Sequence, residues 1–210
     1  MNKDMDQFLE TLDHEMPYLN LPGFTSKGYK IDGNCGLKKT CGFSGLQSVD
    51  YFFIFKSKGL IFIEFSDLHR GYSQEFKHIV ETLKKLIKHA KNSDAILAKE
   101  GNEIKRSLIK RLDKMFLSEF SGKFKDSFFL KETILQHNII DNIPNEIKPG
   151  AVPGYFIVVP PLSTLSNHEQ AEIARFLDGL QSSLSQKITH YHLTHPAQII
   201  TVTDLLQLVP

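Results

Sequence analysis

The sequence of 210 residues has no tryptophan, only two cysteines and no apolar run long enough to cross a membrane. Its longest apolar stretches, Tyr51 to Phe55 and Leu60 to Phe65, have the length of a β-strand, whereas a membrane-spanning helix needs about 18 apolar residues. So few cysteines favour reduced thiols and a cytoplasmic location. The N-terminal segment MNKDMDQFLETLDHEM is acidic and amphipathic, which argues against a signal peptide.

An excess of charge of either sign is also missing, because 25 Lys and Arg oppose 24 Asp and Glu. This balance excludes the basic composition of histone-like proteins and the acidic composition of a disordered tail. The motifs GxGxxG, GxxxxGK[ST], GxSxG and HExxH are absent, which argues against the commonest dinucleotide, nucleotide, serine-hydrolase and zinc-protease sites. The length and a hydrophobic content of 41% predict one globular domain over residues 1–210.

Hydrophobic periodicity and turn residues predict a chain that contains both helices and strands. The clearest signal is a hairpin of two Phe- and Ile-rich strands, Val49 to Lys56 and Gly59 to Ser66. The other expected elements are a helix at 4–16, a glycine-rich loop at 19–45 with short strands near 29–31 and 41–43, two or three helices at 74–118, a connecting segment at 119–154, a strand at 155–159, a helix after the capping box of Ser166 and Glu169, and a strand at 198–203 followed by a short tail. This order predicts an α/β fold, with a mixed central β-sheet and helices on both faces.

Two carboxylates in the predicted hairpin are candidates for a catalytic site. Glu64 stands inside an otherwise buried strand, so it must be paired, bind a metal or lie at the rim of the sheet. Asp50 opens the partner strand. A three-residue turn at 57–59 places Asp50 opposite Ser66, with both acids on one face and one diagonal step apart, whereas a two-residue turn places them on opposite faces.

Carboxylates on adjacent strands are suited to hold Mg²⁺ or Mn²⁺ and to hydrolyse a phosphodiester. The segment that contains Asp50 and Glu64 resembles the PD-(D/E)xK nuclease superfamily, in which an Asp opening one strand and a Glu two positions before a Lys on the next strand bind metal. The predicted order of elements also resembles the core of that superfamily. The resemblance implies a restriction-endonuclease-like fold, a metal site at Asp50 and Glu64, and action on DNA or RNA.

The sequence departs from the superfamily pattern at two positions. Ser66 stands where the catalytic Lys is expected, and Val49 replaces the Pro. Either another cation replaces the missing Lys, with Lys56, His69 and Lys77 nearest in sequence, or the fold is kept and hydrolysis is lost. Glu15 is a candidate third carboxylate. If Glu64 instead meets a structural Lys in the core, the nuclease interpretation fails.

Positive charge is concentrated in the predicted helices, since residues 84–125 carry twelve Lys and Arg against five Asp and Glu. Four of the cations, Lys99, Arg106, Lys110 and Lys114, fall near one helical flank. They are candidates for contacts to the phosphates of DNA or RNA, and the alternative is an ordinary solvated helix face. The same sequence is also compatible with a non-enzymatic module that binds a protein partner or a second copy of itself through the Phe-rich hairpin.

The cluster His190, His192 and His195 lacks an acidic or cysteine partner at a known metal-binding spacing. We expect it to form a loop before the last strand rather than a metal site.

Overall fold

A computed structural model describes residues 3–68, 77–93, 95–193 and 195–209 of the chain. Its elements in order are β1 (Lys3–Asp4), a 3₁₀ turn (Met5–Phe8), β2 (Leu9–Thr11), β3 (Lys27–Lys30), α1 (Leu37–Thr40), β4 (Tyr51–Phe55), β5 (Gly59–Phe65), α3 (Lys77–Ser93), α4 (Ala95–His137), β6 (Ile140–Asp141), β7 (Gly154–Val159), a 3₁₀ turn (Leu162–Thr164), α5 (Asn167–Ile188), a 3₁₀ turn (Thr189–Tyr191), β8 (Gln198–Thr201) and α6 (Val202–Leu208).

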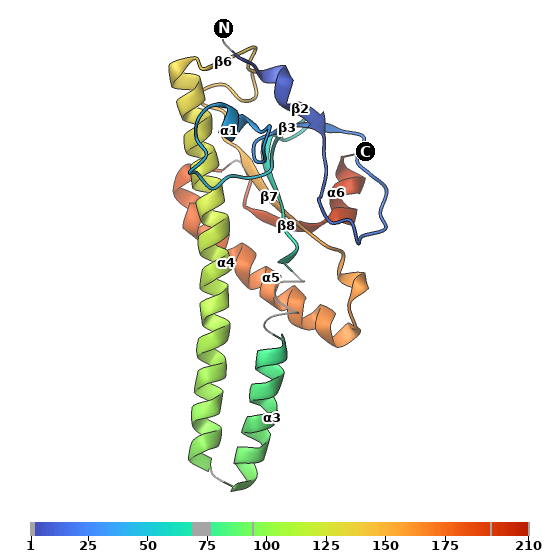
Figure 1. The fold of residues 1–210 in the computed structure, drawn as a ribbon, viewed down its shortest axis with the longest axis vertical. Helices are drawn as coiled ribbons and strands as arrows, with labels where there is room; N and C mark the ends of the chain where they lie inside the picture. The colour runs from blue at the N-terminus through green and yellow to red at the C-terminus, as the bar shows by residue number, and fades with distance from the viewer. Residues whose placement is uncertain (1–2, 69–76, 94, 194, 210) are drawn as a thin grey trace.

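A mixed sheet of six strands forms the centre of the molecule, in the order β2-β3-β4-β5-β7-β8 (Figure 1). The strands from β2 to β5 are antiparallel, whereas β7 and β8 run parallel to β5. The parallel strands are joined by helices, with α3 and α4 between β5 and β7 and α5 between β7 and β8. The predicted α/β class with a mixed central sheet is therefore confirmed.

Helices cover both faces of this sheet. Side chains alternate along each strand, so each face presents its own apolar residues for burial. On one face, Phe52 and Phe62 pack with Phe120 and Phe124 of α4 and with residues of α5 in one buried cluster. The other face is covered by α6 and by apolar residues of the segment between β2 and β3, which join a second cluster around Tyr51, Phe53, Ile61 and Ile63. Among the described residues, no helix is both long and apolar enough to cross a membrane.

The helix pair α3 and α4 extends well beyond the sheet (Figure 1). We call α3 together with residues 95–115 of α4 the helical arm. The two helices approach closely at Gly101, where an added Cβ would lie 2.7 Å from Cγ1 of Ile87. The arm is therefore a packed helical hairpin rather than two separate helices.

The helix predicted at 4–16 is wrong, because this segment contains a short 3₁₀ turn and the edge strand β2 instead. Its apolar residues are buried as expected, but they do not form one stripe. Met5 and Phe8 belong to the cluster on one face of the sheet, whereas Leu12 and Met16 belong to the cluster on the other. The chain passes around the sheet edge between them.

The connecting segment predicted at 119–154 is wrong over its first half, where α4 continues to His137. Phe116, Phe120 and Phe124 recur at a spacing of four residues and are buried against the sheet, so they extend the helical stripe. A strand near 41–43 is also not found, because the short helix α1 ends at Thr40. The short tail after β8 is the helix α6, which begins with a capping box of Thr201 and Asp204.

Candidate functional site

The register of the β4–β5 hairpin brings the two candidate carboxylates to the same end of the sheet. Tyr51 pairs with Ile63 and Phe55 pairs with Gly59, so the turn is formed by residues 56–58. The predicted pairing of Asp50 with Ser66 is therefore wrong. Asp50 directly precedes Tyr51 and Glu64 directly follows Ile63, which places the acids across from each other at the end of the ladder.

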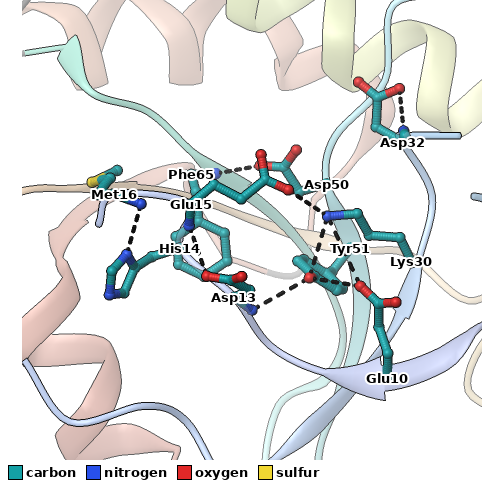
Figure 2. A network of polar contacts seen from close by, with 11 residues as sticks. Glu10, Asp13, His14, Glu15, Met16, Lys30, Asp32, Asp50, Tyr51 and Phe65 are labelled. Carbon is teal, nitrogen blue, oxygen red and sulfur yellow. Dashed lines mark hydrogen bonds and ion pairs between the residues drawn. The ribbon is translucent and has the colours of Figure 1, made fainter. Parts of the chain in front are cut away.

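Asp50 is held by the backbone of both neighbouring strands. Its N–H donates to the carbonyl of Ile63 (3.0 Å), and its carbonyl accepts from the N–H of Ile31 (2.8 Å). Its carboxylate accepts from the N–H of Phe65 at 2.7 Å (Figure 2). Burial raises the pKa of Asp50 to about 6, although this hydrogen bond and the charges of Lys123 and Lys30 act in the opposite direction.

Glu64 is the more deeply buried acid, with 2% of its surface exposed. Its Oε1 accepts from the ammonium of Lys123 at 2.5 Å, whereas its Oε2 has no hydrogen-bond partner among the described residues. Burial and then the charge of Asp50 raise the pKa of Glu64 well above its usual value, and Lys123 only partly opposes them. One lysine therefore does not compensate the two buried carboxyl groups.

Lys123 belongs to α4, and the segment just before β4 is tied to that helix. The N–H of Gln47 donates to Asp126 and the N–H of Val49 donates to the hydroxyl of Ser127, each at 2.9 Å. Gly122, next to Lys123, faces the end of the exposed Gln47 side chain, since an added Cβ would lie 2.4 Å from its Oε1. The same contacts therefore position Asp50 at the sheet and Lys123 on the helix.

A pocket of about 760 Å³ adjoins this group of charged residues. Side chains of α4, α1 and the segments before α1 and β4 line it: Asp32, Lys38, Leu46, Gln47, Ser48, Met115, Ser118, Glu119 and Lys123. Ser48 is buried, and its hydroxyl has no hydrogen-bond partner among the described residues. The Lys123 side chain, 23% exposed, lines this pocket and also contacts Glu64. The pocket therefore adjoins the acids through Lys123, whereas Asp50 and Glu64 do not line it.

Lys123 remains a cation in this setting. Burial alone lowers the pKa of its ammonium, but Glu64, Glu119 and Asp50 outweigh that effect and raise it. Glu119 lies one helical turn away at 3.5 Å. Lys123 therefore places a positive charge beside Glu64 and near Asp50.

A second polar network is formed around the hydroxyl of Tyr51, and Figure 2 draws it together with Asp50. Lys30 contacts Glu15 at 2.9 Å and the hydroxyl of Tyr51 at 3.3 Å, and that hydroxyl donates to Glu10 at 3.0 Å. Glu15, the predicted third carboxylate, lies in a loop at φ 53° and is exposed. Its charge contributes to the raised pKa of Asp50, but its carboxylate is already paired with Lys30.

The cations expected near the acids take other positions. Lys56 is in the hairpin turn, at the end of β4 away from Asp50. His69 and the side chain of Lys77 lie outside the described residues. Lys123 was counted among the cations of the predicted helical basic segment at 74–125 but was not linked to the acids, since residues 119–154 were also predicted to form a connection. The spacing of Phe116, Phe120 and Phe124 was the signal for a helix there.

The four predicted nucleic-acid contacts are all exposed on α4. Lys99 and Arg106 lie on the helical arm. Lys110 and Lys114 border a second pocket, between α4 and α5, together with Arg175. None of these five cations forms an ion pair with another described residue, so all of them are available to an anionic ligand.

The remaining polar candidates do not form a site. His190 lies in the 3₁₀ turn after α5, and His192 caps that turn at φ 52°, in the region predicted to be a loop. Cys35 and Cys41 are free thiols. In the described part of the chain, no group of three or more His, Cys, Asp and Glu side chains is placed to hold a metal.

Asp50 and Glu64 nevertheless fit a hard divalent cation. Mg²⁺ is commonly bound through one or two carboxylates and keeps several of its waters. The Oε2 of Glu64 has no partner among the described residues, and the raised pKa of both acids means that their charged forms lack compensation, which a bound cation would provide. The fit thus rests on two carboxylates with Lys123 beside them.

Comparisons of the chain with protein-family models, with curated proteins and with solved structures gave no match.

Proposed function

We propose that the protein is a divergent metal-dependent nuclease of the PD-(D/E)xK type. In this proposal Asp50 and Glu64 bind Mg²⁺ or Mn²⁺, and Lys123 takes the role of the motif lysine that Ser66 replaces. The observation that carries the proposal is the ammonium of Lys123 at 2.5 Å from the buried carboxylate of Glu64, next to Asp50 and beside a pocket. A cytoplasmic location remains part of the proposal.

The topology supports this assignment. The acids lie on two antiparallel strands, and the second of these, β5, pairs with the parallel strand β7 after a helical connection. From the hairpin onward this order agrees with the one on which the resemblance rests, whereas the helix expected before it at 4–16 is not formed.

The chain's own residues would contribute in three ways. Asp50 and Glu64 hold the ion, which when bound supplies Lewis-acid activation and charge stabilisation for phosphodiester hydrolysis. Lys123 presents a permanent positive charge toward the pocket, where it stabilises negative charge on a phosphate group. The Phe65 amide keeps the Asp50 carboxylate in place.

Lys123 differs from the structural lysine that would defeat this proposal. A lysine sealed in the core would only neutralise Glu64, but Lys123 lines an open pocket and is partly exposed. The ion pair still favours a second candidate, a non-enzymatic nucleic-acid-binding protein, because Glu64 is partnered without a metal. For the alternative of a protein-binding module, Phe52, Phe53 and Phe62 of the hairpin are buried within the sheet, which leaves the partly exposed Phe55 and Phe65 for such a contact.

The test is cleavage of labelled single- and double-stranded DNA and RNA in Mg²⁺ and in Mn²⁺. Wild type and Glu64→Gln are compared, with folding checked by circular dichroism. Metal-dependent cleavage that is lost in a folded Glu64→Gln protein supports the nuclease. Oligonucleotide binding without cleavage in either metal supports the non-enzymatic candidate.

A further inference from the structure

A second pocket, of about 340 Å³, lies between α4 and α5. The polar side chains that line it are Lys110, Asp113, Lys114, Arg175 and Ser183, and apolar residues complete the wall. Two of these cations, Lys110 and Lys114, are among the predicted nucleic-acid contacts. Arg175, from the other helix, joins them only through the fold.

The three cations of this pocket outnumber the acids that line it among the described residues. Lys110 and Lys114 stand one helical turn apart on α4 and so point to the same side. They and Arg175 are exposed, and none of them is ion-paired with a described residue. Asp113 is the only acid lining the pocket in the described part of the chain, and burial raises its pKa. Like charges gathered in one pocket repel each other, and a bound anion removes that repulsion.

This pocket is distinct from the pocket beside the acids. Lys114 and Lys123 are nine residues apart on α4, which corresponds to about 14 Å along the helix axis and to opposite sides of the helix. Lys110 and Lys114 line the α4–α5 pocket, and Glu119 and Lys123 line the other. A substitution in the α4–α5 pocket is therefore not expected to disturb Asp50 or Glu64.

We infer that the α4–α5 pocket binds backbone phosphates of a nucleic-acid strand, through Arg175 of α5 and Lys110 and Lys114 of α4. The planar guanidinium donates two parallel hydrogen bonds to phosphate oxygens, and the two ammonium groups act as point charges. Contacts of this kind position a strand without reading its sequence. The inference rests on the proposed function, because the strand bound here is the substrate of the acid site.

The pocket is tested by fluorescence anisotropy of labelled 20-nucleotide DNA and RNA strands, single and duplex, on the full chain in EDTA. Arg175→Glu is the test variant. Lys187→Glu is the matched control, because Lys187 is an exposed cation on the same helix that does not line the pocket. We expect Arg175→Glu to weaken binding about tenfold or more, Lys187→Glu to change it less than about twofold, and the salt dependence of binding to decrease in Arg175→Glu.

Equal weakening by both variants, no effect of Arg175→Glu, or no binding of any strand by the wild type would overturn the inference. Competition by inorganic phosphate or a mononucleotide as strong as that by an unlabelled strand would also overturn it, because the pocket would then bind a small phosphate compound. Cleavage measurements separate this inference from the proposed function. Arg175-dependent binding without metal-dependent cleavage leaves the pocket standing and removes the nuclease. Metal-dependent cleavage whose KM is unchanged in Arg175→Glu supports the nuclease and removes the phosphate-binding role of the pocket.

Discussion

Helix α4 carries two lysines that are each paired with a glutamate, and the two pairs are built in opposite ways. The Lys131 side chain is 0% exposed, and it pairs with Glu132, the next residue, which is 31% exposed. Its ammonium also lies 5.2 Å from the centre of the Phe128 ring. In the other pair the acid, Glu64, is the buried partner and Lys123 is partly exposed.

The difference separates an anchoring pair from a pair that a ligand can reach. Lys131 is enclosed by the core and its acid reaches solvent, so the pair stabilises α4 and lines neither of the pockets described above. At Lys123 the cation lines a pocket while two buried carboxyl groups lie behind it. Burial of the acid rather than the base is what makes the second pair a candidate site.

The largest expected effect comes from breaking the Lys123 pair. Lys123→Met leaves Glu64 buried without its partner, so we expect the free energy of unfolding to fall by about 3–5 kcal/mol. The double variant Lys123→Met/Glu64→Leu should recover most of this loss, because it removes both charges from the interior. Urea unfolding at pH 7 measures both values. A double variant no more stable than Lys123→Met would contradict the account.

Breaking the Lys131 pair should cost less. In Lys131→Met the carboxylate that loses its partner is that of Glu132, which is partly exposed and can be hydrated instead. The methionine side chain fills the volume of the lysine methylene groups. We expect a loss of about 1 kcal/mol, within the usual range for one hydrogen bond. The same urea titrations measure it, and a loss as large as that of Lys123→Met would erase the distinction between the pairs.

The pH dependence of stability sharpens the comparison further. The pKa of Asp50 is raised from 3.8 to about 6 on folding, so protonated Asp50 stabilises the fold fully below about pH 4. This contribution is lost as the pH rises through about 6, and Glu64 acts in the same direction. Between pH 4.5 and 7.5, the wild type should lose more stability than Asp50→Asn. Thermal unfolding at each pH measures this loss for the two proteins. The same measurement with Mn²⁺ should show stabilisation of the wild type only above about pH 6. Parallel pH profiles for the two proteins would show that Asp50 is not perturbed.

The smallest effect is expected at Gly122, next to Lys123. An added Cβ would meet only the end of the exposed Gln47 side chain, which can move, and alanine favours the helix by about 1 kcal/mol over glycine. Gly122→Ala should therefore leave the free energy of unfolding unchanged or raise it by up to about 1 kcal/mol in urea titrations. A clear loss would mean that the close approach at Gly122, rather than the Asp126 and Ser127 hydrogen bonds, holds the Asp50 segment against α4.

The sequence supported the prediction of the central strands because their patterns are local. The Phe- and Ile-rich hairpin, the apolar strand β7 and the capping box at Ser166 appear where the patterns indicated. The N-terminal segment was mispredicted because its apolar residues serve two cores on opposite faces of the sheet. A helical spacing cannot reveal that arrangement.

The site was predictable only in part, for a similar reason. Asp50 and Glu64 are conspicuous as acids in a strongly apolar hairpin. Lys123 is distant in sequence, and only the packing of α4 on the sheet brings it to Glu64. Arg175 joins Lys110 and Lys114 in the same way, through the packing of α5 on α4.

The most direct test of the central claim is single-turnover cleavage by Lys123→Met and Lys131→Met, measured side by side with wild type in Mn²⁺. Both are assayed well below their unfolding temperatures, on proteins shown to be folded and to bind the oligonucleotide. The account predicts a rate at least about 100-fold lower for Lys123→Met, the size typical for loss of one group that stabilises transition-state charge, and a nearly unchanged rate for Lys131→Met. Equal rates in the two variants would contradict it, because Lys123 would then be a second anchoring lysine.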